Sequence, residues 1–429
     1  MDFIQNQDSE NKIILDEAKK NKRLKLHSFH RYYGKLIPAI PQAYIRKFTQ
    51  EGDLVFDPFV GSGTTALEAR ANNRNFIGVE VNPLSVLISR AKTNTYDKET
   101  LNKLYEFIEK YIYNNDISVD EKDLPFVINR DHWFKEEVQK DLILIEKAIE
   151  ESLKLDVVND KKIYSDFLYG VLSAIVKLVS NADTRHVFPG VSKRVRQLEL
   201  EGKNNKDAKA SFLRGLRKRI NDALEIPDTD SDIKIYESDI TEIDLSDYDK
   251  KVDLIVTNPP YISSVRYAET MKLELYWMEV IKSQTEYSDL SNQIIGNDRI
   301  LKEDYQDLYL TKYDFINDII SEMYNKDKKN AKVISDFFNL MDIVVEKMYN
   351  ILKPGGVVVM KISDSRIRKT RIETGRLLTD IAKSKGFELF DLFDDKISKN
   401  SRSLTTARNV YSDIILHDNI VFWRKPDEK

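Results

Sequence analysis

The chain has 429 residues, of which 41% are hydrophobic and 32% are charged, and its formal net charge is −4. This length suits a catalytic domain with an insertion or a second lobe. The absence of cysteine excludes disulfides and cysteine-ligated zinc, and we expect no metal. No stretch is apolar enough to span a membrane and the N-terminus does not resemble a signal peptide, so we expect a cytoplasmic protein.

The first 50 residues divide into two parts. Residues 1–26 are polar and rich in lysine, with a weak helical pattern at Ile13, Ile14, Leu15 and Ala18, and we predict a mobile or loosely docked N-terminal arm. Residues 27–50 carry histidines, tyrosines and two prolines, and without further information they read as a structured loop that covers the first strand.

Two short strands follow, with a glycine-rich turn between them. The first predicted strand is 54–56, and residues 57–63 then read Asp-Pro-Phe-Val-Gly-Ser-Gly before a helix begins at Thr64. The second strand, 76–80, ends at Glu80, a candidate acceptor for ribose hydroxyls. The glycine spacing also fits the dinucleotide fingerprint. If the turn is taken alone, NAD is therefore one ligand that this site could bind.

A long insertion, residues 96–232, separates the second strand from the third. Its apolar periodicity predicts helices over 101–113, 135–155, 164–179 and 208–224. Basic side chains outnumber acidic ones between residues 185 and 219, which favours contact with nucleic acid phosphates. The residues selected for this role are Arg185, Lys193, Arg194, Arg196, Arg217, Lys218 and Arg219, with Arg368 from a later basic loop. The alternative for any one of them is a solvated helix face.

The most informative segment is the tetrapeptide Asn258-Pro259-Pro260-Tyr261, which we call the hook. It follows the apolar run 252–256, predicted to be a buried parallel strand. The prolines end the strand because they lack an N–H, and Pro259 moves Asn258 out of the α region. Open α/β sheets bind ligands at this edge, so the hook is predicted to lie in a binding site.

The remaining pattern completes an α/β fold. Strands are predicted at 233–237, 356–362, 387–391 and 420–423, and residues 264–345 are mostly helical. Alternating strands and helices predict a doubly wound, mostly parallel sheet, to which the insertion adds a helical part. Boundaries are expected near 95 and 232, so that 27–95 and 233–425 form one catalytic domain. A third basic loop lies at 401–408.

The hook has a specific chemical use. An exocyclic amino group on a base is a poor nucleophile because its lone pair is delocalised into the ring. The Asn258 side-chain oxygen and the Pro259 carbonyl can each accept one of its hydrogens, and Tyr261 can stack on the base. Such a site orients the amino nitrogen toward a methyl donor and needs no covalent intermediate.

These motifs resemble those of the amino-directed DNA methyltransferases, which methylate adenine N6 or cytosine N4. The resemblance rests on 57–65 and the hook, and extends through 30–38, 78–83 and 352–356. It implies the class I Rossmann-like methyltransferase fold with an antiparallel last strand. It also implies S-adenosylmethionine as cofactor and a flipped base as substrate. The resemblance says little about residues 96–229, so the insertion is the candidate DNA-binding and target-recognition region on the strength of its basic residues alone.

The resemblance assigns residues to two roles. The catalytic residues are Asn258, Pro259, Pro260 and Tyr261. The cofactor-binding residues are Tyr33, Gly34, Lys35, Pro38, Asp57, Pro58, Phe59, Gly61, Gly63, Thr64, Glu80, Asn82 and Asp239. For Tyr267 and Trp277, base stacking and simple core packing are both open, and core packing is preferred for Trp277.

The base and the rival functions stay open at this point. Asn before Pro-Pro favours adenine N6, whereas 265–277 looks more like cytosine-N4 relatives. Methylation at cytosine C5 is excluded, because it requires a cysteine. The rivals are an RNA base methyltransferase, a protein-glutamine methyltransferase and a non-catalytic DNA-binding subunit. The expected partners are double-stranded DNA and a separate restriction endonuclease, in a restriction-modification or defence system.

Overall fold

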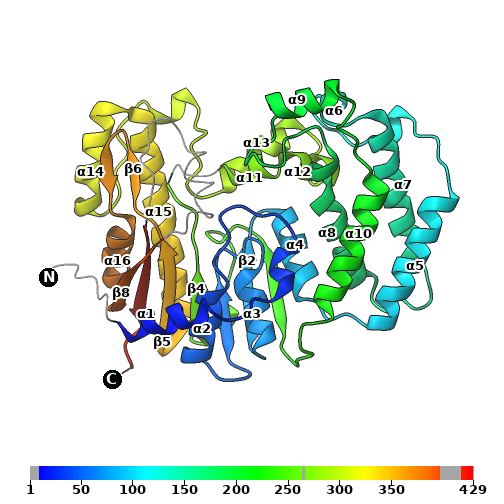
Figure 1. Cartoon of the computed structure of the whole chain (residues 1–429). Helices are drawn as coiled ribbons and strands as arrows, with labels where there is room; N and C mark the ends of the chain where they lie inside the picture. The colour runs from blue at the N-terminus through cyan, green and yellow to red at the C-terminus, as the bar shows by residue number, and fades with distance from the viewer. Residues whose placement is uncertain (1–8, 263–265, 397–416, 429) are drawn as a thin grey trace.

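The protein is built around a seven-stranded sheet with the order β3-β2-β1-β4-β5-β9-β8 (Figure 1). The computed structural model describes residues 9–262, 266–396 and 417–428. The strands are β1 (Leu54–Asp57), β2 (Asn75–Glu80), β3 (Ile233–Glu237), β4 (Val252–Thr257), β5 (Leu352–Ile362), β8 (Glu388–Lys396) and β9 (His417–Arg424). All neighbouring pairs are parallel except the two that β9 makes, with β5 and β8. This is the predicted doubly wound fold with an antiparallel last strand.

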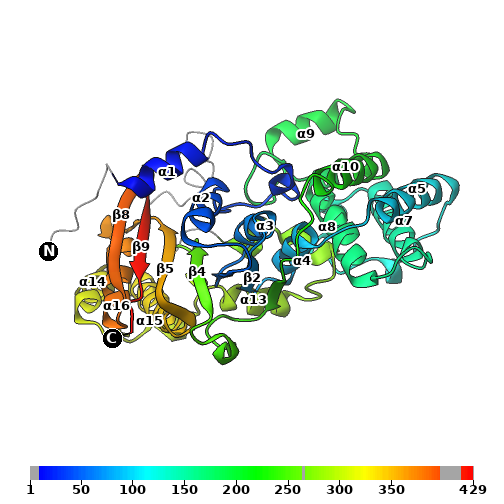
Figure 2. The ribbon, with the colours of Figure 1, turned by 90° about the horizontal axis from the view of Figure 1, so that it is seen from below.

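Alternation along the strands divides the core into two layers. Val55, Leu254 and Val357 face one cluster, which includes residues of α2 (Ala39–Phe48) and α3 (Thr64–Ala71). Their neighbours Phe56, Ile255 and Val358 face the other, with residues of α15 (Lys328–Ile351) and α16 (Thr374–Ser384). Figure 2 shows these helix pairs on opposite sides of the strands. Strands buried on both faces are near-continuously apolar, which explains why the sequence revealed them.

Two strands differ in detail from the prediction. β5 begins at Leu352, ahead of the predicted start at 356, and its first part pairs with β4 through an irregular register. β9 is last in the chain but lies between β5 and β8. A small hairpin, β6 (Ser365–Ile367) and β7 (Thr370–Ile372), follows β5 outside the sheet.

The insertion is helical, as its periodicity predicts. Its helices are α5 (Lys98–Asn114), α6 (Arg130–Trp133), α7 (Glu136–Ser152), α8 (Lys161–Val179), α9 (Lys193–Leu200) and α10 (Ala208–Ala223), with a short 3-10 helix η2 (Glu121–Asp123). Their apolar side chains form one cluster with Leu84 and Ile88 of α4 (Pro83–Thr93). The insertion therefore packs directly on a helix of the sheet domain.

The helices of the segment 264–345, predicted as one helical unit, pack into two different hydrophobic clusters. α11 (Tyr267–Thr270), α12 (Lys272–Trp277) and α13 (Gln284–Gln293) contribute to the cluster of the insertion, whereas α14 (Asp314–Lys326) and α15 contribute to the sheet core. Residues 264 and 265 lie outside the described residues. Short 3-10 helices lie at η3 (Ser246–Tyr248) and η4 (Lys302–Tyr305).

Part of the segment predicted to be a mobile arm is a packed helix, α1 (Glu10–Ala18). Leu15 is fully buried, and the Tyr44 hydroxyl donates to the carbonyl of Asn11 at 3.0 Å. The Asn11 side chain also bonds Asp391 of β8 at 2.7 Å. Leu15 and Ala18, which belong to the helical pattern of the sequence and lie about one turn apart, form the buried side of this helix. The 3-10 helix η1 (Lys25–Ser28) follows.

Among the described residues, no helix meets the length and hydropathy needed to cross a membrane. In the same part of the chain, histidine and carboxylate side chains form no group of three suited to hold a metal ion.

Candidate active site

A cavity lies at the carboxyl ends of β1 to β4, as expected for an open α/β sheet. Its empty volume is about 840 Å³, open mouth included. The predicted residues that line it are Gly34, Lys35, Asp57, Pro58, Phe59, Gly61, Thr64, Glu80, Asn82, Asp239, Asn258 and Pro260. The residues that sequence reasoning missed include Tyr32, Ser62, Thr65, Ser238 and residues 293–295 of α13 and the loop after it. Residues separated by more than 200 positions thus share one wall.

Asp57 connects the glycine-rich turn to the strand that carries the hook. Its carboxylate accepts hydrogen bonds from Thr257 of β4 and Thr65 of α3, both at 2.8 Å, and from the Phe59 amide at 3.0 Å. The side chain is only 3% exposed. Burial raises the pKa of Asp57 to about 6 despite these bonds. A cation in the cavity would stabilise the carboxylate.

Glu80, at the end of β2, is held by two backbone amides. Gly61 donates to one carboxylate oxygen at 2.8 Å and Asn82 to the other at 2.9 Å. Each oxygen keeps a second lone pair that can accept from a ligand hydroxyl. Burial raises the pKa of Glu80 to about 7.

Two hydroxyls beside the turn are without partners. Ser62 Oγ and Thr64 Oγ1 are buried and accept or donate no hydrogen bond among the described residues, yet both residues line the cavity. Gly63 between them has φ +71°, and a Cβ there would lie 2.9 Å from Ser89. Leaving a buried hydroxyl unpaired costs roughly 1–3 kcal/mol, so a polar ligand group is expected here. The first turn of α3 favours a negatively charged one.

The hook presents Asn258 to the same cavity in a fixed orientation. Its Nδ2 donates to the carbonyl of Gly34 at 3.1 Å, and its Oδ1 accepts from the Tyr261 hydroxyl at 3.1 Å. The two contacts identify which end of the amide is oxygen. An amide oxygen has two lone pairs, so Oδ1 can accept a further N–H from a substrate.

A buried network supports Tyr261 from behind. Lys361 of β5 donates to the Tyr261 oxygen at 2.9 Å and pairs with Asp418 of β9 at 2.7 Å. Ser363 donates to the other oxygen of Asp418. The side chains of Lys361 and Asp418 are 10% and 7% exposed. Although burial opposes its charge, Tyr261 and Asp418 raise the pKa of Lys361 well above its usual range.

The aromatic residues after the hook differ in role. Tyr267 lines the cavity, and its ring lies 3.1 Å from the position that a Cβ on Gly34 would take. Trp277 is a core residue, as preferred from the sequence, because it is 1% exposed, packs on Phe134 and donates to Glu146 at 2.9 Å.

Five predicted site residues do not line the cavity. Tyr33 points away from it and donates to the carbonyl of His186 at 3.0 Å. Pro38 and Gly63 are the N-cap residues of α2 and α3, so they shape the cavity through the backbone. Pro259 and Tyr261 complete the list. Tyr261 orients Asn258 in this structure, where base stacking had been predicted.

Comparisons with known proteins agree with this geometry. A family model described as DNA methylase, for N6 and N4 enzymes, matches residues 6–91. Type II methyltransferase M.MvaI of Kocuria varians is 25% identical over 412 residues, which are 89% of this chain and 86% of that protein. Type II methyltransferase M.BsoBI of Geobacillus stearothermophilus is 24% identical, over 97% of this chain and 88% of that protein.

Residues 6–91 thus match the N6/N4 DNA methylase family, and the relatives that align with most of the chain are type II methyltransferases. A shorter match, with 34% identity over 91 residues, is to type II methyltransferase M.MjaII of Methanocaldococcus jannaschii; it covers 21% of this chain and 17% of that protein. S-adenosylmethionine is the methyl donor of the family, and the cavity fits it. The buried carboxylates suit its cationic and hydroxyl groups, and the unpaired hydroxyls of Ser62 and Thr64 suit its carboxylate.

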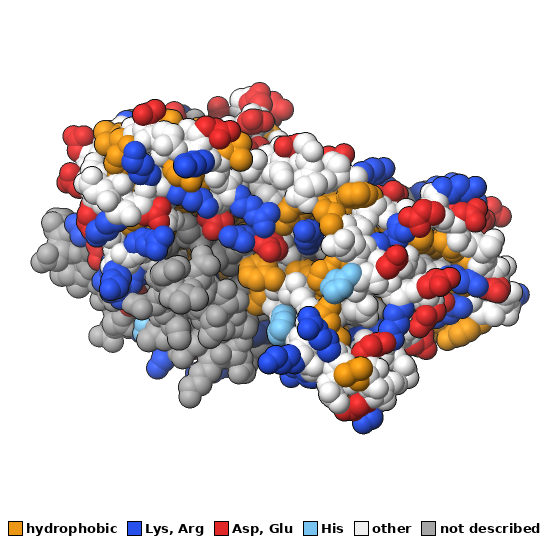
Figure 3. All heavy atoms as spheres, turned by 90° about the horizontal axis from the view of Figure 1, so that it is seen from above, with side chains coloured by type: hydrophobic (Ala, Val, Ile, Leu, Met, Phe, Trp, Pro, Cys, Tyr) orange, Lys and Arg blue, Asp and Glu red, His pale blue; other side chains and the backbone are white. Residues whose placement is uncertain are grey.

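The structure separates the predicted nucleic-acid residues into groups. Arg185 and Arg194 both bond the buried carboxylate of Asp183, in the loop between α8 and α9. Lys193 and Arg196 are exposed on α9 nearby. Figure 3 views the face at the carboxyl ends of the strands, where basic, acidic and apolar side chains are mixed. This face therefore has no uniformly positive surface among the described residues.

The other residues predicted to contact DNA interact in part with neighbouring groups of the protein. Arg219 donates to the carbonyls of Phe29, at 2.7 Å, and Gly215, at 3.0 Å. The Arg217 guanidinium lies 3.7 Å from the Tyr105 ring, and Lys218 pairs with Asp222. Arg368 pairs with Asp327 at 2.9 Å. The fold thus holds the Arg219 side chain, and its assignment to DNA stays a prediction. The loop 401–408 lies outside the described residues.

Proposed function

We propose that this protein transfers a methyl group from S-adenosylmethionine to the exocyclic amino nitrogen of a base flipped out of double-stranded DNA. One observation carries the proposal: Asn258 lines the same cavity as Asp57 and Glu80. A rigid amide acceptor and a cation-compatible cofactor site are thereby adjacent. The relatives that match most of the chain are named type II methyltransferases, which supports DNA as substrate.

We assign the cofactor contacts from the donors and acceptors on the cavity wall. Glu80 accepts from ribose hydroxyls, and Asp57 stabilises the cationic amino acid end of the cofactor. Ser62 and Thr64 donate to the cofactor carboxylate, and Asp239 accepts from the adenine amino group. The bound cofactor supplies an electrophilic methyl group next to the hook.

The hook then acts by orientation. Asn258 Oδ1 and the Pro259 carbonyl accept the two hydrogens of the target amino group, which directs the nitrogen lone pair at the methyl group. Tyr261 and Gly34 hold the amide of Asn258, which lines the cavity, in one orientation. Restricting the reactants to near-attack geometry is the main contribution of such a site. Flipping costs a few kcal/mol, which contacts with the extruded base offset.

The base and the biological setting belong to the proposal as well. Asparagine in the hook favours adenine N6, and cytosine N4 is the alternative. The names of the relatives support a restriction-modification role, with a separate endonuclease as partner.

The test is transfer of labelled methyl from S-adenosylmethionine to unmethylated genomic DNA, followed by mass spectrometry of the digested nucleosides. N6-methyladenine supports the full proposal, and N4-methylcytosine corrects the base. Asn258→Ala is expected to stop transfer and retain cofactor binding, while exposed Asn115→Ala is the matched control. If no nucleoside is labelled although cofactor binds, RNA and protein-glutamine substrates take the place of DNA.

A further inference from the structure

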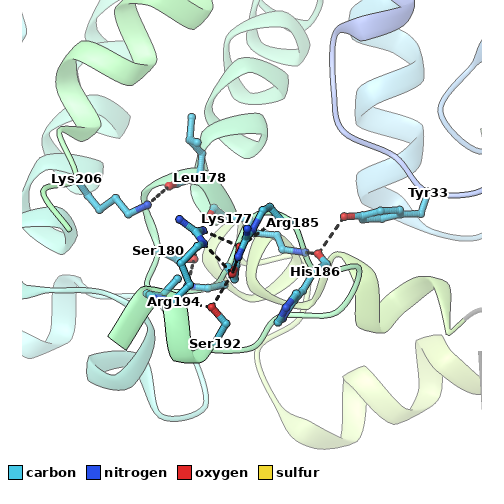
Figure 4. Close-up of polar contacts among 12 residues, drawn as sticks. Tyr33, Lys177, Leu178, Ser180, Arg185, His186, Ser192, Arg194 and Lys206 are labelled. Carbon is cyan, nitrogen blue, oxygen red and sulfur yellow. Dashed lines mark hydrogen bonds and ion pairs between the residues drawn. The ribbon is translucent and has the colours of Figure 1, made fainter. Parts of the chain in front are cut away.

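Two arginines, Arg185 in the loop between α8 and α9 and Arg194 in the first turn of α9, donate hydrogen bonds to one buried carboxylate. Arg194 donates to Asp183 at 2.8 and 3.3 Å, and Arg185 donates to it at 3.2 and 3.3 Å. Ser192 adds a hydrogen bond of 2.6 Å. Figure 4 shows Arg185, Arg194 and Ser192 converging on this point. We call Asp183 with its two arginines the arginine fork.

In the arginine fork the carboxylate is buried and the two arginine side chains are partly exposed to solvent. Asp183 is fully buried, whereas the side chains of Arg185 and Arg194 are 64% and 42% exposed. The Asp183 amide donates to the carbonyl of Gly190 at 2.8 Å, which closes the loop. The hydrogen bond from Arg194 is the main reason that the pKa of Asp183 lies well below its usual range. Two positive groups on one carboxylate leave a net positive charge at the surface.

The loop that carries the fork is fastened to the active site. The carbonyl of His186 accepts from Tyr33 at 3.0 Å and from Lys177 at 3.2 Å. Figure 4 shows the Tyr33 ring pointing toward His186. Gly34, the next residue in the chain, holds the Asn258 amide. Two consecutive residues therefore connect the fork loop and the hook.

We propose that Asp183 is a positioning residue that presents Arg185 and Arg194 to guanine edges in the target sequence. This inference rests on the proposed function, because it requires DNA as substrate. A guanidinium can donate two parallel hydrogen bonds to O6 and N7 of guanine, a contact that depends on its orientation. Phosphate contact does not require such fixation, and the exposed Lys193 and Arg196 suffice for it. A buried carboxylate that fixes two exposed arginines suits base recognition.

The test compares sequence specificity in full-length variants. Methylated sites of the wild-type protein are first mapped by sequencing DNA from a host that expresses it. The same map, and transfer rates on the cognate duplex and its single-base variants, are then measured for Asp183→Asn. Arg185→Lys and Arg194→Lys keep the charge and leave Asp183 intact, so they report even when Asp183→Asn folds poorly. Glu201→Gln, which removes an exposed carboxylate paired with Lys203, is the control.

The expected result is a fall of about 10- to 100-fold in discrimination at one or more guanine positions. Cofactor affinity should be unchanged. An unaltered site map in the lysine variants overturns the proposal, as does a uniform loss of rate on all duplexes, which indicates phosphate contact. A wild-type protein that methylates no DNA would instead refute the proposed function, so the two failures are distinguishable.

Discussion

The hydroxyl of Thr257 donates a hydrogen bond of 2.8 Å to Asp57. Thr257 is the last residue of β4 and the neighbour of Asn258, whereas Asp57 ends β1 and lines the cofactor cavity. This hydrogen bond therefore links the end of β1, proposed to bind the methyl donor, to the end of β4, which carries the hook. Catalysis by proximity needs such a fixed distance, because small displacements of the reacting groups cost much of the rate.

Cofactor affinity is expected to depend on pH through the two buried carboxylates. Burial raises the pKa of Asp57 to about 6 and that of Glu80 to about 7. A cationic ligand favours the ionised forms and lowers both pKa values. Binding should therefore be strongest above pH 8, weaken as the pH falls through 7 and 6, and release protons in that range. Calorimetry in two buffers of different ionisation enthalpy measures the release.

Variants identify the groups responsible for this pH dependence. Asp57→Asn and Glu80→Gln should each weaken binding and flatten its pH profile. Asp53→Asn alters a carboxylate just before the opposite end of β1 and should leave the profile unchanged. A wild-type affinity that is constant between pH 5.5 and 8 would contradict the assignment.

Gly34 is predicted to matter for catalysis as well as for backbone strain. Both Gly34 (φ +74°) and Gly52 (φ +83°) are left-handed, so alanine at either position costs about 1–2 kcal/mol. Only at Gly34 does a Cβ meet the Tyr267 ring, at 3.1 Å, next to the carbonyl that holds Asn258; at Gly52 nothing lies within 4 Å. Gly34→Ala should lower kcat by about tenfold or more, and Gly52→Ala should not. Equal kcat values, at matched fractions of folded protein, would show that the contact is unimportant.

The network behind the hook is expected to act on kcat rather than on binding. Tyr261→Phe keeps the ring and removes the hydroxyl that orients Asn258 Oδ1, so we expect kcat to fall about tenfold, with the cofactor Kd unchanged. Lys361→Met should lower kcat too, and it also leaves Asp418 buried without its cation, at a cost of about 3–5 kcal/mol of stability.

The double variant tests whether these residues act as one unit. If Lys361 works through Tyr261, then Tyr261→Phe/Lys361→Met should have the kcat of the poorer single variant. Multiplicative losses would indicate that Lys361 reaches the reaction by another route.

The sequence predicted the strands of the sheet and, to within one residue, the carboxyl ends of β1 to β4, but it could not predict the supporting contacts. Strands such as β4 are apolar runs bounded by turn residues, which is local information, and the hook is a contiguous motif. The bond from Asn258 to Gly34 joins residues 224 positions apart, and that from Lys361 to Tyr261 spans 100. Such pairings follow from the register of the sheet, which a single sequence does not specify. Ser62 was missed although it stands within the predicted turn.

The basic residues of α10 show that neighbours in the sequence can have different surroundings in the structure. Arg217, Lys218 and Arg219 are adjacent in sequence and were assigned together to DNA. On α10 they point to different surroundings, because successive helical residues are about 100° apart. Arg219 consequently meets the Phe29 carbonyl, while Arg217 lies on the Tyr105 ring. Composition indicates that a segment is basic, and only the helix orientation decides which cations are available.

Arg219→Ala is therefore expected to destabilise the protein rather than weaken its contact with DNA. The substitution removes charged hydrogen bonds to the carbonyls of Phe29 and Gly215, so we expect a loss of about 2–3 kcal/mol in the free energy of unfolding. Arg214→Ala, at an exposed position of the same helix, should cost little. Denaturant unfolding measures both effects.

In DNA binding, Arg219→Ala should keep the wild-type salt dependence, whereas Lys193→Ala/Arg196→Ala should reduce the slope of log K against log salt concentration by about 2. A reduced slope for Arg219→Ala would return this residue to the DNA interface, since a side chain confined to the fold releases no counterions from DNA.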